Sequence, residues 1–342
     1  MRAARFVGVG QPLEIVSLQD PVPGLGEALV RVRAVGLCGS DVHIMEGHTP
    51  TAFTPITLGH EISGVLEVLG PDTSAPAAPG DHVFVNPLVG CGTCRQCRQG
   101  NFNFCPQRCG MGILRDGGLA DFLISPARNL VAVPKSLGFP EVALIESAGT
   151  ANQAIRVLEV GKGDAIVVIG TGGLGMQAVR IARAHGVEVY AIDTDPVARK
   201  RSVDAGVATA FDPGEADLVA KLRTIAGRPY GFDGVVDCVG LPASFSTALD
   251  LLRPNGHCAI IGIGAVPLTL TPPAHFMRRA LRVSGIYGYS QEDIRQVAAM
   301  LIDGSLDLKA SVSAVLPLER VNEGLQLFAD RKSSPVRVVI EP

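Results

Sequence analysis

Four cysteines lie close together in the sequence with a spacing that suits a metal ion. Two residues separate Cys91 from Cys94 and Cys94 from Cys97, and seven residues separate Cys97 from Cys105. Zn²⁺ is held by four such sulfurs in a closed tetrahedron that leaves no position for a substrate, so sites of this kind are structural. The final Cys-Pro pair also resembles a ferredoxin segment, but bacterial ferredoxins have three residues before it. The spacing favours structural zinc over an iron–sulfur cluster, free thiols or disulfides.

A second set of candidate ligands is dispersed along the chain. It comprises Cys38, Ser40, Asp41, His43, His60, Glu61 and Glu146. Glu146 is flanked by apolar residues, where a carboxylate needs a partner or must take up a proton. Taken singly, Cys38 fits a core thiol, His60 a hydrogen-bonded core histidine and Glu146 half of an ion pair. The residue types alone therefore leave open both a shared metal site and an ordinary buried environment.

A glycine-rich loop follows an unbroken apolar run at residues 165–169, which is typical of a strand buried on both faces. The loop has the pattern G-x-G-x-x-G and leads into a segment with helical spacing, then a second strand that ends at Asp193. In dinucleotide-binding folds these glycines allow a sharp turn, close approach of the pyrophosphate and tight packing of the helix. The order of elements predicts dinucleotide binding. The expected contacts are Gly170, Gly172, Gly173, Leu174, Gly175 and Asp193.

The residue at the end of the second strand indicates which dinucleotide binds. Asp193 lies 18 residues after Gly175, where a carboxylate accepts hydrogen bonds from the adenosine ribose. Its charge would repel a 2′-phosphate, which favours NAD. Arg199, Lys200 and Arg201 follow on the next helix and leave NADP open.

Two domains of different architecture are expected to position these groups. The 342 residues suit two domains. Residues 1–149 contain short β-branched or alternating runs between Gly and Pro turns, which predicts an irregular antiparallel, barrel-like domain. Residues 150–289 alternate strands and helices, which predicts a doubly wound parallel sheet. The pattern changes again at 290–342, so we expect a cofactor domain inserted into a β-rich domain.

Composition narrows the function classes. The chain is 47% hydrophobic and 18% charged, with a net charge of −3. No basic block is present, and there are no Trp and only four Tyr, which argues against a nucleic-acid partner. No apolar run is long enough to span a bilayer, and no signal segment is recognised at the start. We therefore expect a cytoplasmic protein with neither nucleic-acid nor membrane partners.

Taken together and in order, the motifs resemble those of the zinc-dependent alcohol dehydrogenases of the medium-chain dehydrogenase/reductase family. The resemblance covers nearly the whole chain, and it implies a GroES-like catalytic domain at 1–149 and 290–342. A structural zinc lobe at about 90–109 would belong to that domain, and 150–289 would be a Rossmann NAD(P)-binding domain. The motifs are Cys38-Gly-Ser40-Asp-x-His43, Gly59-His60-Glu61-x-x-Gly64, the four-cysteine lobe, Asp116-Gly117-Gly118 and the Gly170 loop.

The resemblance also implies roles for the dispersed residues. Cys38, His60 and Glu146 would be ligands of a catalytic zinc, with Glu61 as an exchangeable ligand. Ser40 and His43 would relay a proton to solvent, and Arg337 would contact the cofactor pyrophosphate. The structural zinc would be held by Cys91, Cys94, Cys97 and Cys105. Family members that act on polyols have proline after the glutamate, where this chain has Ser147.

The activity implied is interconversion of an alcohol, secondary or polyhydric, with its ketone or aldehyde by hydride transfer to or from NAD. Relatives of this length are often homotetramers and sometimes dimers. Three alternatives remain: an NADP-preferring reductase of the same family, a relative that reduces double bonds or quinones without metal, and a non-catalytic cofactor-binding relative. Metal-free relatives generally lack the Cys38/His60 pair, which is present here.

Overall fold

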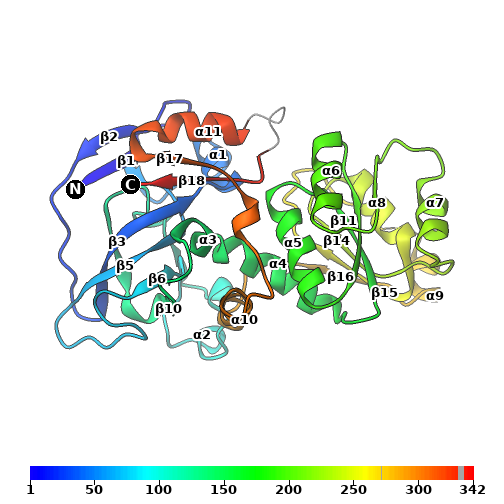
Figure 1. The fold of residues 1–342 in the computed structure, drawn as a ribbon, viewed down its shortest axis with the longest axis horizontal. Coiled ribbons are helices and arrows are strands. Elements are labelled where there is room, and N and C mark those ends of the chain that lie inside the picture. The colour runs from blue at the N-terminus through cyan, green and yellow to red at the C-terminus, as the bar shows by residue number, and fades with distance from the viewer. Residues whose placement is uncertain (271, 330–334) are drawn as a thin grey trace. The chain divides into compact units, whose positions relative to one another are not determined.

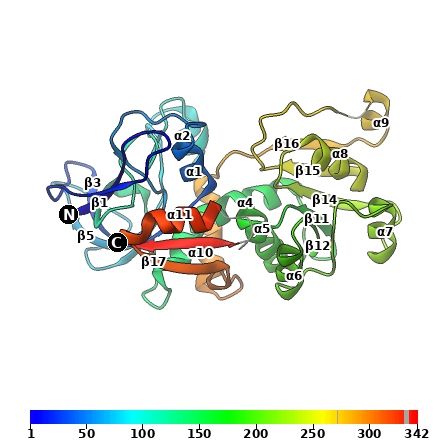
Figure 2. The ribbon, with the colours of Figure 1, turned by 90° about the horizontal axis from the view of Figure 1, so that it is seen from above.

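The chain forms two compact units, which Figures 1 and 2 draw from two directions. The computed structural model describes residues 1–270, 272–329 and 335–342. Unit 1 contains Met1–Ser147 and Ser290–Pro342, and unit 2 contains Ala148–Tyr289, so the first division falls inside helix α4 (Ile145–Leu158). Among the described residues, no helix has both the length and the apolar character needed to cross a membrane.

Unit 1 is β-rich and is built from both ends of the chain. Its strands are β1 (Arg2–Phe6), β2 (Glu14–Ser17), β3 (Glu27–Gly36), β4 (Ile56–Thr57), β5 (Glu61–Leu69), β6 (His82–Val85), β7 (Leu88–Val89), β8 (Cys109–Gly110), β9 (Phe122–Pro126), β10 (Leu130–Val133), β17 (Val312–Pro317) and β18 (Arg337–Glu341). Its helices are α1 (Gly39–Met45), α2 (Arg95–Arg98), α3 (Phe139–Ala143), α10 (Gln291–Ile302) and α11 (Val321–Ala329). Four short 3₁₀ turns among the described residues are η1 (Phe102–Phe104), η2 (Ala127–Asn129), η3 (Lys309–Ser311) and η4 (Leu318–Arg320).

Strand β3 organises unit 1. It pairs antiparallel with β5, with β9 and with β18 from the other end of the sequence. Its alternate residues Ala28, Val30 and Val32 are buried in the main core of the unit, as the period of a half-buried strand requires. Strands β2, β1 and β4 form a second sheet, and β7 pairs with β8. The expected antiparallel, barrel-like architecture is confirmed, with an additional parallel pair between β17 and β18.

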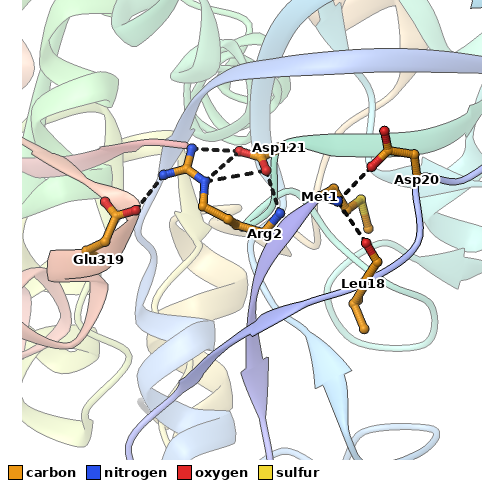
Figure 3. Close-up of polar contacts among 6 residues, drawn as sticks. All are labelled: Met1, Arg2, Leu18, Asp20, Asp121 and Glu319. Atoms are coloured by element: carbon orange, nitrogen blue, oxygen red, sulfur yellow. Dashed lines mark hydrogen bonds and ion pairs between the residues drawn. The ribbon is translucent and has the colours of Figure 1, made fainter.

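Polar contacts tie the first strand to distant segments, as Figure 3 shows. The amino group of Met1 lies 2.6 Å from Oδ1 of Asp20. The guanidinium of Arg2 pairs with Asp121, just before β9, at 2.7 Å and with Glu319 in η4. Each pair has at least one exposed partner (Asp20, Arg2 or Glu319), so the pairs contribute little to stability, but they link residues from opposite ends of the sequence.

Unit 2 is a doubly wound parallel sheet, as expected. Its strands are β11 (Ala165–Ile169), β12 (Glu188–Ile192), β13 (Ala210–Phe211), β14 (Phe232–Asp237), β15 (Leu252–Ile260) and β16 (Arg282–Gly285). Its helices, besides the end of α4, are α5 (Gly173–Ala184), α6 (Pro196–Asp204), α7 (Leu218–Ile225), α8 (Pro242–Leu251) and α9 (Pro273–Arg278). The strand order is β13-β12-β11-β14-β15-β16, so the order reverses between β11 and β14. Helices α5 and α6 contact β12 on one face, and α8 contacts β14 and β15 on the other (Figure 2).

Two strands of unit 2 end earlier than their apolar runs. The apolar runs at 234–239 and 259–263 predict strands over those residues, but β14 ends at Asp237 and β15 at Ile260. Apolar side chains continue into the loops, so hydrophobicity alone places these strand ends too late, and it also misses the start of β15 at Leu252. The backbone instead turns at Gly240, whose φ of +71° favours glycine.

Candidate active site and cysteine lobe

The pairing of β3 with β5 assembles a group of three ligand-type side chains. Cys38 stands at the N-terminus of α1, two residues after β3 ends. His60 precedes β5 and Glu61 begins it, and the register places Glu61 opposite Gly36. One ligand atom from each of Cys38, His60 and Glu61 lies within 4.8 Å of the other two. A thiol, an imidazole and a carboxylate thus meet at one end of the β3–β5 ladder.

Glycines make room for this group. A methyl group on Gly36 would lie 2.2 Å from Oε2 of Glu61, so a larger residue here would force the Glu61 side chain to move. Gly59, at φ +89°, turns the backbone just before His60, and a methyl group on Gly117 would lie 2.2 Å from its carbonyl oxygen. Asp116 accepts a hydrogen bond from the amide of Thr57 at 2.8 Å. The Asp116-Gly117-Gly118 motif therefore packs against the backbone that presents His60.

Asp41 faces His60, a position that the residue types alone do not predict. Its carboxylate is fully buried, and Oδ2 accepts a hydrogen bond from the Cys38 amide at 2.9 Å. Oδ1 lies 3.6 Å from Nδ1 of His60, while Nε2 of His60 lies 3.3 Å from the Ser40 hydroxyl. Carboxylates that face the far nitrogen of a ligating histidine are a common feature of zinc sites. The three-residue spacing of Asp41 from Cys38 within one motif was the available signal.

Electrostatics act differently on the three candidate ligands. Burial opposes ionisation of the Cys38 thiol, but contact with His60 and the charge of Arg337 outweigh it and lower its pKa to about 7. Burial also lowers the pKa of His60, but Asp41 dominates and raises it well above its ordinary value. The Glu61 carboxyl has a pKa well above its ordinary value because burial outweighs the opposing charge of Arg337.

Glu146 and Arg337 lie near the group. Glu146 is in the first turn of α4, and its charge interacts with both Glu61 and Arg337. It is not part of the tight group formed by Cys38, His60 and Glu61. Arg337, at the start of β18, is buried, and its Nη1 lies 3.3 Å from Oε1 of Glu61. The family resemblance implies that Arg337 contacts the cofactor pyrophosphate, and in the structure its guanidinium pairs with Glu61.

The two residues predicted to relay protons lie on α1 in different environments. Ser40 is partly buried, and its hydroxyl lies 3.3 Å from Sγ of Cys38 and from Nε2 of His60. His43 is exposed, and its ring meets that of His48 edge-on with a centroid distance of 6.0 Å. Ser40 thus touches the candidate ligands, and His43 can exchange protons with water.

The dispersed group fits a zinc ion chemically. Sulfur, imidazole nitrogen and carboxylate oxygen are the donors that zinc binds in proteins. Among the described side chains, both buried oxygens of Glu61 and Nδ1 of His60 have no hydrogen-bond partner. Buried polar atoms are normally satisfied, and a bound cation would satisfy the Glu61 oxygens.

The four predicted lobe cysteines also converge. One sulfur from each of Cys91, Cys94, Cys97 and Cys105 lies within 4.8 Å of the other three. The amides of Cys91, Cys94 and Cys97 point at sulfurs of Cys105, Cys91 and Cys94 at 3.3–3.4 Å. Hydrogen bonds from Thr93 and the Cys94 amide lower the pKa of the Cys91 thiol to about 5. This set of four sulfurs fits a closed zinc site.

The glycine-rich loop adopts the predicted strand–loop–helix geometry. Gly170 follows β11 with φ +82°, and Gly172 is the N-cap of α5, where no atom lies within 4 Å of an added methyl group. A methyl group on Gly175 would lie 1.8 Å from the Gly170 carbonyl oxygen. Gly173 and Leu174 form the first turn of α5, whose N–H groups are free to face an anion.

Asp193 lies immediately beyond β12, beside this loop. Its Oδ2 accepts hydrogen bonds from the amide and hydroxyl of Thr171 at 2.6 and 3.0 Å. Arg199 does not reach toward open space, because its Nη1 contacts the carbonyl of Asp193 at 2.7 Å and Oδ2 of Asp212 at 2.8 Å. Asp193, the acid that favours NAD, therefore lies next to the glycine-rich loop, and the nearby Arg199 is already paired with Asp212.

Comparison with known proteins agrees with the dehydrogenase family that the sequence motifs resemble. The alcohol dehydrogenase GroES-like domain family matches residues 24–135, and the zinc-binding dehydrogenase family matches residues 173–303. A sorbitol dehydrogenase of Halalkalibacterium halodurans is 28% identical over 94% of this chain and 94% of its own. L-galactonate-5-dehydrogenase of Escherichia coli is 30% identical over 86% of each chain.

Solved structures share the fold over the full length. Alcohol dehydrogenase TADH from Thermus sp. ATN1 is 29% identical, with a TM-score of 0.91 over 100% of this chain and 99% of its own. An NAD-dependent alcohol dehydrogenase is 31% identical, with a TM-score of 0.90 over all of both chains. With these identities and two family matches in order, the chain belongs to the zinc-binding alcohol dehydrogenases of the medium-chain dehydrogenase/reductase family.

Proposed function

We propose that this protein interconverts an alcohol, secondary or polyhydric, with its ketone or aldehyde, using NAD. The observation that carries the proposal is the convergence of Cys38, His60 and Glu61, with ligand atoms within 4.8 Å, near the charge of Glu146. Relatives named sorbitol dehydrogenase and L-galactonate-5-dehydrogenase act on polyhydric substrates by their names, which supports this substrate class.

We further propose one catalytic and one structural zinc per chain. Cys38 and His60, with Glu146 and the exchangeable Glu61, would hold the catalytic ion, and the four lobe cysteines would hold the structural one. When bound at the dispersed group, zinc supplies a Lewis acid that makes an alcohol O–H acidic near neutral pH. NAD, when bound at the Gly170 loop, accepts the hydride.

The chain's own residues would manage the proton. Ser40 lies 3.3 Å from both Cys38 and His60, so its hydroxyl can accept a proton from an alcohol at this group and pass it on. His43, exposed on the same helix, would release it to water. Asp41 would hold His60 in its orientation.

The cofactor proposal is NAD rather than NADP. Asp193 lies beside the glycine-rich loop, and Arg199 is held by Asp212, so neither favours a 2′-phosphate. NADP remains the second candidate because a dehydrogenase from Sinorhizobium meliloti 1021, 27% identical to this chain, was solved with NADP. The mutation Asp193→Ala should reduce the preference for NAD about tenfold, because it removes one or two hydrogen bonds between the adenosine ribose and a charged carboxylate. Asp204→Ala, which removes an exposed partner of Lys200 on α6, is the control. Unchanged NAD and NADP kinetics in Asp193→Ala would remove this role.

We also propose a homo-oligomer, a tetramer rather than a dimer. Strand β16 lies at an edge of its sheet, where another chain can pair. Val266, Met277 and Tyr287 in the same part of unit 2 are large, apolar or aromatic and more than half exposed. Light scattering of purified protein tests this, and a monomer at micromolar concentration would contradict it.

One experiment tests the proposed activity directly. Purified protein is analysed for zinc and then assayed for NADH formation with primary, secondary and polyhydric alcohols. We expect about two zinc ions per chain and turnover of secondary or polyhydric alcohols. Zinc in the lobe alone, with no NADH from any alcohol, would contradict the proposal.

A further inference from the structure

A fully buried carboxylate holds the loop that follows β14. Asp237, the last residue of that strand, accepts hydrogen bonds through Oδ1 from the amides of Val239 at 2.9 Å and Gly240 at 3.1 Å. Its Oδ2 accepts from the hydroxyl of Ser244 in the first turn of α8 at 3.0 Å. A buried charge needs such donors, and here the donors are mainly the backbone of one short loop.

The loop that Asp237 holds packs directly against the glycine-rich loop. A methyl group on Gly170 would lie 2.7 Å from Cγ2 of Val239. A methyl group on Gly175 would lie 3.3 Å from Sγ of Cys238. Displacement of residues 238–240 would therefore disturb the turn and the helix start that face the cofactor pyrophosphate.

The same loop also touches the loop that follows β15. A methyl group on Gly240 would lie 2.4 Å from the Gly262 carbonyl oxygen, and one on Gly264 would lie 2.0 Å from the Gly240 carbonyl oxygen. The carbonyl of Asp237 accepts hydrogen bonds from the amides of Ile261 at 2.9 Å and Gly262 at 3.1 Å. Three loops are thus packed together, and Asp237 forms hydrogen bonds with two of them.

Asp237 lies where the sheet reverses its strand order. The register pairs it with Ile169, the last residue of β11, and β11 and β14 are the neighbours between which the order reverses. Ligands of open α/β sheets bind outside the carboxyl ends of the strands at this point. Asp237 therefore lies next to the expected cofactor site and holds residues 239 and 240 of a loop at its edge.

We propose that Asp237 is a positioning residue for the dinucleotide: it fixes the backbone of residues 238–240, which in turn supports the glycine-rich loop. The inference rests on the proposed function, because it assumes that NAD binds at the Gly170 loop. Asp237 makes no contact with the cofactor itself in this scheme, and its loss should weaken dinucleotide binding without changing the metal group of unit 1.

The same strand offers a matched control at its other end. Asp233, in β14, is also largely buried and accepts a hydrogen bond from the amide of Ala165 at 2.8 Å. It pairs with Arg253 at 2.7 Å and with Arg228 at 3.4 Å. Its variants should destabilise unit 2 at the amino end of the sheet, far along the strand from the loop that Asp237 holds.

The experiment measures the Kd of NADH by fluorescence titration of the full-length protein. Asp237→Ala removes all three acceptor contacts and should raise the Kd about tenfold, whereas Asp237→Asn, whose amide oxygen can still accept from Val239 and Gly240, should raise it about threefold. Asp233→Asn should change it less than about twofold. In each variant the zinc content, the KM for alcohol and kcat at saturating NAD should stay at the wild-type value, while the KM for NAD follows the Kd.

Each outcome is informative. Weaker NADH binding in the Asp237 variants alone supports the inference, and Asp237→Asn decides it if Asp237→Ala does not fold. Wild-type Kd in Asp237→Asn together with wild-type Kd in folded Asp237→Ala overturns it. Equal weakening in Asp233→Asn also overturns it, because that result indicates general loosening of unit 2. Failure of the wild-type protein to bind NADH would instead remove the proposed function.

Discussion

The two candidate zinc groups of unit 1 are built in opposite ways. The four lobe cysteines fall within residues 91–105, and backbone amides of the same lobe point at three of their sulfurs. The dispersed group takes Cys38 from the end of β3, His60 and Glu61 from the start of β5, and the nearby Arg337 from β18. The lobe depends on local chain geometry, whereas the dispersed group depends on strand register across the unit.

The two groups also differ in the ligand atoms that they offer to a metal ion. The lobe offers four sulfurs, which suit a closed coordination shell. The dispersed group offers mixed donors, buried Glu61 oxygens without hydrogen-bond partners and an adjacent hydroxyl from Ser40. A closed group stabilises a fold, and an open mixed group can admit a substrate oxygen. Activity should therefore depend on the dispersed group and stability on the lobe.

The largest effect is expected for Cys38→Ser. Loss of the thiolate should remove the catalytic zinc and reduce turnover by about a thousandfold, since a Lewis acid contributes several kcal/mol to the barrier. The variant should keep its fold and the lobe zinc, so metal analysis should find about one ion fewer per chain. Full turnover in this variant, or loss of both ions, would contradict the division between the two groups.

An intermediate effect is expected for Asp41→Asn. In this variant an amide replaces the carboxylate that lies 3.6 Å from Nδ1 of His60. The amide carries no negative charge to stabilise a proton on Nδ1. Partners of this kind are worth about 10–100-fold in metal affinity, so zinc competition at the dispersed group should show a loss of that order. Asp121→Asn, which removes the partner of Arg2 in the same unit, is the control. Equal zinc affinity in Asp41→Asn and the wild type would show that Asp41 does not orient His60.

The same contrast explains how much could be predicted from the sequence. The four lobe cysteines converge as their spacing predicted, because short chain segments limit where their sulfurs can lie. The parallel sheet of unit 2 was predicted because β11 is apolar throughout and glycines punctuate its end. Both features are local, and local patterns are visible in a single sequence.

Features that depend on long-range packing were less accessible. Residue types alone left Cys38 and His60 as possible core residues, and only the register that places Gly36 opposite Glu61 brings them together. Helix α4, which carries Glu146, was not predicted from the sequence. Its Gly149-Thr150 step has low helix propensity, so formation of the helix depends on tertiary packing. Asp237 attracted no role because its partners are backbone amides, which have no sequence signature.

The smallest effect on activity is expected for Cys97→Ser in the lobe. Cys97 is buried, and its sulfur lies 3.9 Å from that of Cys91, so the variant should lose the structural zinc and lower the Tm by about 5–10 °C, given a loss of a few kcal/mol. Hydrogen bonds to backbone carbonyls link the lobe to the rest of unit 1: Gly100 accepts one from the Gln291 amide at 2.9 Å, and Gly90 accepts one from the Arg128 guanidinium at 2.7 Å. Turnover per folded chain, measured below the Tm, should therefore stay within about twofold of the wild type.

Cys109→Ser is the matched control for this variant, because Cys109 follows the lobe but is not part of its group of sulfurs. It should keep both zinc ions, the wild-type Tm and full turnover. If Cys97→Ser instead lost turnover while keeping the dispersed zinc, the lobe would contribute to the chemistry. A group assembled from neighbouring residues would then share the catalytic role that we propose for the group assembled from distant strands.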